Sequence, residues 1–118
     1  MTPAATRPSG FKRIVLKLSG EAFGPRDGSG IDADEAARIA GELVKLPEMG
    51  VEVAVVVGGG NILRGSVFAS DRIGRATADT MGMLATVINA LALQESLESM
   101  GVPARVTTAI GMSEVAEP

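Results

Sequence analysis

Two glycine-containing segments stand out in this sequence because their residues could hold an anion. Lys17–Gly20 (KLSG) ends one apolar run, and Gly58–Gly65 (GGGNILRG) directly follows another. Lys17 places a cation in an apolar strand, where burying an unpaired ammonium would be costly. Glycine lets backbone N–H groups approach a phosphate closely. The guanidinium of Arg64 could bind phosphate through two N–H groups at once. Both segments therefore predict contact with phosphate.

Each segment also has a purely structural interpretation. KLSG could be a strand-end lysine followed by an ordinary turn, and alone it favours neither interpretation. The triple glycine could be a flexible turn, but its conformational entropy cost favours a phosphate-binding role. The segments form neither a P-loop nor a dinucleotide-binding fingerprint, because G-x-x-x-x-G-K-[ST] and G-x-G-x-x-G are both absent.

The composition excludes most other chemistry. The 118 residues contain no Cys and no His, which excludes disulfides, Cys-based zinc sites, thiol nucleophiles, Ser-His-Asp triads and His bases. There is no Trp or Tyr to stack a base, and a net charge of −3 is wrong for a nucleic-acid-binding module. Glycine is in excess, with 15 residues where about 7% is usual. Lys, Arg, Asp, Ser and backbone amides remain, and these suit phosphate handling.

A third candidate, Asp79, precedes the apolar segment Met81–Thr86 (MGMLAT). An Asp at the start of a buried helix is first of all a helix cap. The functional alternative is an acceptor for a ribose hydroxyl. From the residues alone, the cap is the favoured interpretation.

The elements that must position these residues follow from hydrophobic patterning. The β-branched apolar runs predict strands, the second buried on both faces. Asp32 and Glu35 are spaced like a capping box, and the apolar stretch 81–93 predicts a helix buried on all sides. The expected order is strand 14–18, loop 21–30, a helix after Asp32 closed by Pro47 and Gly50, strand 51–57, helix 77–100 and strand 104–109. This order indicates an α/β architecture, in which ligands bind beyond the carboxyl ends of the strands.

The N-terminal segment Met1–Gly10 contains Thr, Pro, Ser and Gly, and we expect it to be a flexible arm. It lacks an apolar core, so it is not expected to be a signal peptide. The longest charge-free stretch, between Asp79 and Glu95, is shorter than the ~20 residues that a membrane span needs. We therefore expect no membrane contact and a cytoplasmic location. The chain is 46% hydrophobic, which predicts either unusually tight packing or an apolar surface that meets something outside the chain.

In this order and spacing, the strand ending in KLSG, the GGGN-x-x-RG loop and the D-x-MGMLAT helix resemble the bacterial uridine monophosphate (UMP) kinases, a branch of the amino-acid kinase superfamily. GGGN and Lys-x-x-Gly are shared across the superfamily, whereas MGMLAT is typical of the UMP kinase branch. The resemblance runs from about Lys12 to the end of the chain. It implies a three-layer α/β/α sandwich with a mainly parallel sheet. Residues 11–118 would form its N-terminal, UMP-side part, without the C-terminal, ATP-side half.

The resemblance implies the reaction ATP + UMP → ADP + UDP with Mg²⁺, no metal ligand in this part of the chain, a homohexamer, activation by GTP and inhibition by UTP. Its catalytic residues would be Lys17 and Arg64. ATP would be bound by Lys17, Leu18, Ser19, Gly20, Gly60 and Arg64. UMP would be bound by Gly58, Gly59, Arg64 and Asp79, which gives Asp79 a role beyond a cap. The GTP segment would be Pro25, Arg26, Asp27, Gly28, Ser29 and Gly30.

The chain departs from the resembled family in two ways. It has about half the family's length, so we expect the isolated chain to be inactive. Thr80 stands where relatives often have His. Two alternatives remain open. One is another amino-acid kinase family phosphotransferase, with a carboxylate or carbamate acceptor. The other is a non-catalytic half-domain that binds a nucleotide or mediates oligomerisation.

Overall fold

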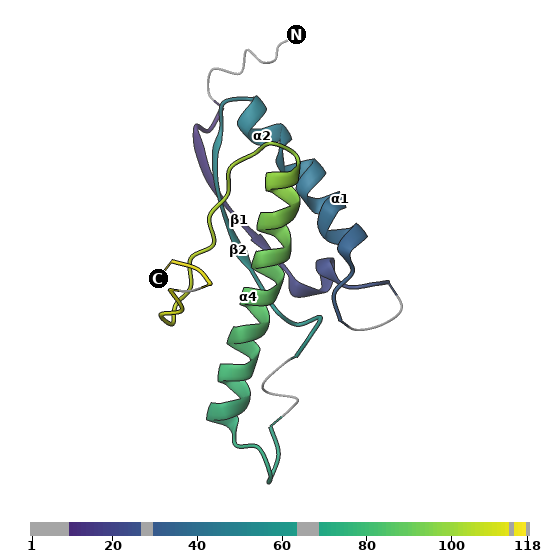
Figure 1. The fold of residues 1–118 in the computed structure, drawn as a ribbon, viewed down its shortest axis with the longest axis vertical. Helices are drawn as coiled ribbons and strands as arrows, with labels where there is room; N and C mark the ends of the chain where they lie inside the picture. Colours follow the sequence, from purple (N-terminus) through teal and green to yellow (C-terminus); the bar gives the residue numbers. More distant parts are fainter. Residues whose placement is uncertain (1–9, 27–29, 64–68, 114, 118) are drawn as a thin grey trace.

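A computed structural model describes residues 10–26, 30–63, 69–113 and 115–117. The elements are β1 (Arg13–Leu18), the 3-10 helix η2 (Gly20–Phe23), α1 (Ala33–Leu43), α2 (Lys45–Glu48), β2 (Glu52–Val57) and α4 (Arg75–Ser99) (Figure 1). β1 and β2 pair in parallel, and α1 lies in the connection between them. The predicted α/β class is therefore confirmed. The expected N-terminal arm lies outside the described residues, apart from Gly10.

The sheet formed by β1 and β2 is covered by helices on one face only. The strands run in register from Arg13 opposite Glu52 to Leu18 opposite Val57, and exposed residues alternate with half-buried ones along both. On the uncovered face, Val15 is 69% exposed and Val56 is 52% exposed. The prediction that strand 51–57 is buried on both faces is therefore wrong. The described residues supply one helical layer against the sheet, and none of them forms the second layer of a sandwich.

Helix α1 begins as its capping signal predicts. The Asp32 carboxylate accepts hydrogen bonds from the backbone N–H groups of Asp34 at 2.8 Å and Glu35 at 3.4 Å. These bonds satisfy N–H groups that have no partner within the helix. The buried residues of α1 recur at helical spacing and face the core: Ala36, Ile39, Ala40 and Leu43.

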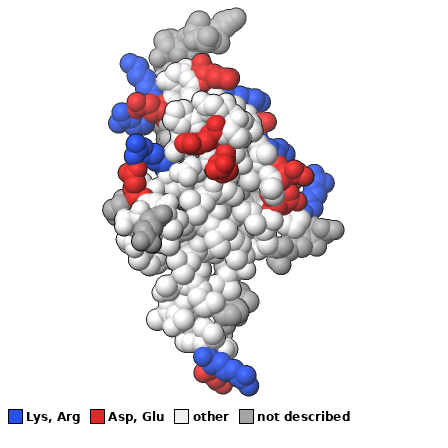
Figure 2. Space-filling view, in the orientation of Figure 1, with Lys and Arg blue, Asp and Glu red and all other residues white. Residues whose placement is uncertain are grey.

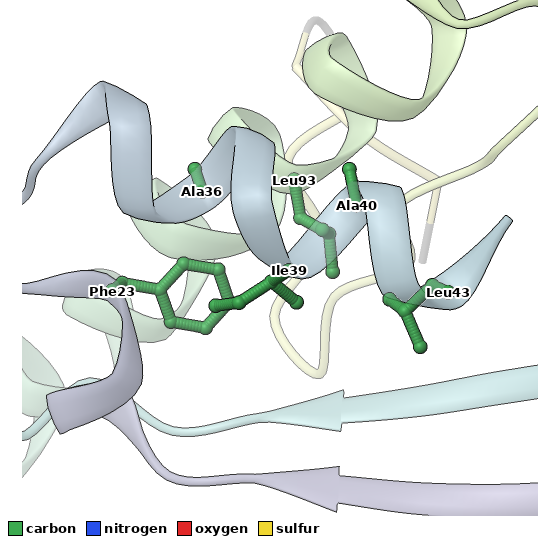
Figure 3. Packing of buried hydrophobic residues seen from close by; sticks show 6 residues of the cluster. All are labelled: Phe23, Ala36, Ile39, Ala40, Leu43 and Leu93. Atoms are coloured by element: carbon green, nitrogen blue, oxygen red, sulfur yellow. The ribbon is translucent and has the colours of Figure 1, made fainter.

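The core lies between α1, α4 and the covered face of the sheet. Phe23, which is fully buried, and Ile39 point from η2 and α1 toward the strands (Figure 3). Leu93 of α4 and half-buried strand residues complete the cluster. The segment 21–30 was predicted as a loop, but it begins within η2. The composition reveals its glycines and charges, whereas burial of Phe23 stabilises a helical turn that composition alone does not indicate.

Helix α4 begins at Arg75, two residues earlier than predicted. Its cap position is Gly74, so Asp79 lies in the second turn, and the cap interpretation is wrong. Ala78, Ala85, Asn89 and Leu93 form its buried stripe. Its other side is apolar yet open, as at Ile88, which is 47% exposed. The expected all-round burial is therefore wrong, because the described elements that pack most against this helix, α1, η2 and β2, leave its other side open.

By length and hydropathy alone, α4 could cross a membrane, since it has 25 residues and an 18-residue stretch with a mean hydropathy of 1.3. The core helix of a soluble protein passes the same test. Here α4 packs along α1 and buries the polar side chain of Asn89 against Gly58–Asn61, the glycine segment.

The predicted third strand, residues 104–109, does not form a ladder. Its only strand-like pairing in the described part of the chain is an isolated bridge between Thr107 and Glu117. The segment instead lines a cavity of about 1000 Å³ together with β2 and α4. Extended backbone becomes a strand only when a neighbouring strand pairs with it, and β2 pairs only with β1.

Candidate functional site

The two predicted phosphate-binding segments meet at the carboxyl ends of β1 and β2. The Gly58 N–H donates to the Leu18 carbonyl at 2.9 Å. A Cβ atom at Gly20 would lie 2.8 Å from the Gly59 carbonyl carbon and 2.9 Å from Asn61 Oδ1. This contact excludes a side chain at position 20. The structure thus brings Leu18, Gly20 and the glycine segment into direct backbone contact.

The glycine segment also packs directly on α4. A Cβ atom at Gly59 would lie 2.8 Å from the Ala85 Cβ and 2.9 Å from the Thr86 nitrogen. The Gly59 carbonyl accepts from the N–H groups of Ile62 at 3.0 Å and Leu63 at 3.1 Å. The chain therefore leaves β2 and enters a helical turn, with the helix backbone pressed against it.

Two backbone donors remain in this arrangement. Gly58 is committed, because its N–H bonds to Leu18 and its carbonyl accepts from Asn89 at 2.9 Å. The N–H groups of Gly59 and Gly60 have no acceptor within the described ranges. Successive free N–H groups form a concave anion site. Gly58 is thus held through both its N–H and its carbonyl. Gly59 is buried against α4 and the Gly60 nitrogen packs against Gly20, so these two N–H groups are candidate donors in a tightly packed turn.

Lys17 lies on the uncovered face of the sheet, one residue before the end of β1. It is exposed, stands opposite Val56, and forms no ion pair with an acidic residue in the described part of the chain. Ser19 is committed locally, since its hydroxyl donates to the Glu21 carboxylate and accepts from the Glu21 N–H at 3.3 Å. The ammonium is therefore available to an anion bound at this edge, whereas the serine hydroxyl already has partners.

Within the described part of the chain, Asp79 pairs with its helix neighbour Arg75 at 2.9 Å and forms no hydrogen bond with Gly58–Asn61. Its side chain is 53% exposed. It lies seven residues before Thr86, which is nearly two turns, so both residues share one side of α4 about 10 Å apart along the axis. The structure therefore places this carboxylate on the same side as the anion site but separate from it.

Other predicted residues are only partly described. Arg64 and the segment 27–29 lie outside the described residues. Pro25 and Arg26 line a cavity of about 660 Å³ that Gly60 also borders. Gly30 has φ +97°, a conformation that favours glycine. The segment predicted for GTP thus adjoins the glycine segment at both of its described ends.

Two functional candidates were missed. Asn61 and Asn89 are 6% and 0% exposed, and their side chains hydrogen-bond to each other. Asn61 lies within the GGGN motif, and Asn89 lies within the charge-free stretch between Asp79 and Glu95. A buried amide requires partners, so an Asn within an apolar helix was itself a signal.

No group of three or more acidic residues in the described ranges could hold a metal ion. The available groups at this edge are donors and a cation, which fit phosphate oxygens. Magnesium is commonly bound through substrate phosphates with only one or two carboxylates. A magnesium ion at this site would therefore arrive with the nucleotide phosphates.

Known proteins resemble this chain in sequence and in fold. Residues 12–115 match the family model described as the amino acid kinase family. The chain is 39% identical to a UMP kinase from Bacillus anthracis, with a TM-score of 0.83. This match covers 92% of the present chain and 45% of the Bacillus anthracis chain. A UMP kinase from Ureaplasma parvum is 37% identical, with a TM-score of 0.81. That match covers 92% of the present chain and 46% of the Ureaplasma parvum chain. A carbamate kinase from Giardia lamblia bound to AMP-PNP is 16% identical, with a TM-score of 0.56, and shares the fold.

The chain spans less than half the length of these solved structures, and its described residues form an N-terminal part of the fold that they share. The structure supplies the expected parallel sheet and helices, and the family model covers nearly all of the sequence. The chain belongs to the amino acid kinase family.

Proposed function

We propose that this chain is the UMP-side part of a kinase that transfers the γ-phosphoryl group of ATP to UMP, giving ADP and UDP. The observation that carries the proposal is the junction of KLSG with the glycine segment. There, the N–H groups of Gly59 and Gly60 have no acceptor among the described residues, and Lys17 is exposed one residue before the end of β1. The likeness to two UMP kinases at 37% and 39% identity supports UMP as the acceptor.

The available groups suit in-line phosphoryl transfer. An oxygen of the UMP phosphate attacks the γ-phosphorus, and the bond from that phosphorus to the β,γ-bridging oxygen breaks. The nucleophile is already anionic, so a chain without histidine needs no general base. Lys17, Arg64 and the Gly59 and Gly60 amides stabilise negative charge on the transferred group. A magnesium ion bound with ATP supplies further charge neutralisation.

Asp79 fits the nucleoside end of UMP in this proposal. With phosphate at Gly59, the ribose extends along the side of α4 that carries both Thr86 and Asp79. The distance of about 10 Å along the axis is comparable to the length of a nucleoside monophosphate. The Asp79 carboxylate would then accept a ribose hydroxyl and release Arg75, an exposed ion pair that is worth little in itself.

The wider proposal includes a homohexamer, GTP as activator acting through residues 25–30, UTP as inhibitor and a cytoplasmic location. It also includes inactivity of residues 1–118 on their own. The coverage of 45% and 46% of the similar solved structures supports this last point. Residues 1–118 would then bind nucleotide without turning it over.

The test is an acceptor panel with ADP release as the signal. The protein that carries this sequence is assayed with Mg·ATP and, separately, UMP, carbamate, aspartate and glutamate. We expect ADP release with UMP alone. Release with carbamate or an amino acid would assign the chain to another branch of the family. UMP binding without turnover at any protein length would instead support a non-catalytic half-domain.

A further inference from the structure

Two buried side-chain amides connect the glycine segment to α4. Asn89 Nδ2 donates to Asn61 Oδ1 at 2.7 Å, and Asn61 Nδ2 donates to Asn89 Oδ1 at 3.2 Å. Asn89 lies on the buried stripe of α4 and is fully buried. The pair therefore joins a loop residue to a helix residue 28 positions later in the chain.

The remaining donor of each amide holds a backbone carbonyl. Asn89 Nδ2 also donates to the Gly58 carbonyl at 2.9 Å, and Asn61 Nδ2 donates to the Gly30 carbonyl at 2.8 Å. A carbonyl oxygen can only accept, so each of these contacts fixes which end of the amide is nitrogen. Both amides thus have all their N–H groups and their oxygen engaged.

These bonds fix the residue that precedes the two free donors. Gly58 is held through its N–H by Leu18 and through its carbonyl by Asn89. The next two residues, Gly59 and Gly60, carry the free N–H groups. On the other side, the Gly30 N–H donates to the Asn61 carbonyl at 2.7 Å. The direction of the free N–H groups is therefore set by bonds that converge on Gly58 and Asn61.

We propose that Asn89 is a positioning residue which, with Asn61, holds the Gly58–Gly60 backbone in the orientation that binds nucleotide phosphate. An apolar residue at the fully buried position 89 would avoid the desolvation cost of an amide. The amide's distinctive contribution is directional bonding to Gly58 and Asn61. The inference rests on the proposed function for the identity of the ligand, whereas the hydrogen-bonded connection does not.

The test compares Asn89→Leu with Gln94→Leu, both on α4. Leucine is close to asparagine in size but makes no hydrogen bond. Gln94 also anchors a distant backbone group, since its Oε1 accepts from the Val106 N–H at 3.0 Å. Each variant is titrated with UMP and with Mg·ATP, and the amide signals of Gly30, Gly58, Gly59 and Gly60 are followed by NMR. Urea unfolding of each variant shows that it is folded.

We expect Asn89→Leu to shift these glycine signals and to weaken nucleotide binding about tenfold or more. Gln94→Leu should leave the glycine signals in place and the nucleotide affinity within about twofold of that of the unchanged protein. Unchanged affinity in folded Asn89→Leu would overturn the proposal. Equal losses in both variants would also overturn it, because they would indicate a general effect of altering α4.

A double-mutant cycle covers the case in which Asn89→Leu does not fold. Asn61→Ala, Asn89→Ala and the double variant are compared for nucleotide affinity and for the Gly58 signal. Either single change breaks the pair, so the double variant should lose little more than the worse single variant. Additive losses would overturn the pairing.

Failure of the proposed function gives a different result. If the unchanged protein binds neither UMP nor Mg·ATP, the proposed function fails for this site. The hydrogen-bonded connection is then judged by the Gly30 and Gly58 signals alone. If the Gly30 and Gly58 signals do not change when the Asn89 amide is removed, the proposed connection is overturned as well.

Discussion

At the scale of single residues, the candidate site depends on two glycines, which have no Cβ atom. Gly20 and Gly59 each stand where a Cβ atom would collide with backbone of another segment. The two glycines allow β1, the glycine segment and α4 to approach closely enough to leave the Gly59 and Gly60 N–H groups at one edge. The positions at which side chains are excluded thus define the site as much as Lys17 does.

A matched pair of glycine substitutions tests this close approach. Gly20→Ala should lower the free energy of unfolding by about 1–3 kcal/mol, because its Cβ would lie 2.8 Å from the Gly59 carbonyl carbon. Gly41→Ala lies within α1 with no atom in reach, and should raise it by about 0.5–1 kcal/mol. Urea unfolding of both variants measures these changes. Equal effects of the same sign would contradict the packing argument.

Replacing Lys17 is expected to change function but not stability. Its side chain is exposed and unpaired in the described part of the chain, so Lys17→Ala should leave the urea midpoint unchanged. In the active kinase it should reduce turnover by roughly 100-fold or more, with little change in UMP affinity, as expected for a group that stabilises transferring charge. Steady-state kinetics with varied UMP separates the two effects. Turnover close to that of the unchanged protein would contradict the role of Lys17.

At the scale of elements, the placement of the site depends on where α1 and α4 begin and which face they cover. The cap at Asp32 fixes the start of α1, and α1 then buries Ile39 and Leu43 against the sheet. Core packing of α4 against α1 brings Ala85 and Asn89 onto the glycine segment. The site is therefore held by packing on one face of the two-stranded sheet.

The cap gives the second stability prediction. Asp32→Ala should lower the free energy of unfolding by about 1 kcal/mol, because the N–H groups of Asp34 and Glu35 lose their acceptor. Asp71→Ala is a suitable control, since Asp71 is exposed and lies outside any helix or strand. Thermal or urea unfolding compares the two. An equal loss in both variants would show that the charge, and not the cap, matters.

Local patterns in the sequence predicted the elements better than they predicted burial. The capping box, the β-branched runs and the long apolar segment gave β1, α1, β2 and α4 within two residues at most ends. The turn that buries Phe23 was not predicted, because its cause is packing in space. The same holds for residues 104–109, whose extended pattern needs a pairing strand that the described chain lacks.

The candidate site was likewise predictable from the sequence only in part. Motif residues around KLSG and GGGN were predicted to share an edge, and the structure places Leu18, Gly20 and Gly58–Gly60 in contact. The Asn61–Asn89 pair was not predicted, because 28 positions separate its members and only the fold brings them together. Which glycine N–H groups are free could not be predicted either, since this depends on bonds to Leu18 and Asn89.

At the scale of the whole molecule, apolar residues face outward on both the sheet and α4. Val15 is 69% exposed on the uncovered sheet face, and Leu84 is 40% exposed on α4. Figure 2 shows charged residues toward both ends of the molecule and a broad uncharged region between them, where α4 lies. The apolar excess in the composition is thus located on the uncovered sheet face and on the open side of α4.

The share of the fold that these residues span leads to a prediction about activity. Purified residues 1–118 with Mg·ATP and UMP should form no measurable UDP, because they span 45% of the Bacillus anthracis enzyme and 46% of the Ureaplasma parvum enzyme. Chromatographic separation of UDP from UMP measures this directly. Sustained UDP formation by these residues alone would show that half the fold length suffices for catalysis.

The most direct test of the central claim is whether the glycine segment binds the phosphate of UMP. The ¹⁵N-labelled chain is titrated with UMP and, separately, with uridine, which lacks only the phosphate. The account predicts that UMP shifts the amide signals of Gly59 and Gly60, and that uridine at equal concentration does not. A folded chain in which these signals ignore UMP, or respond equally to uridine, would contradict it.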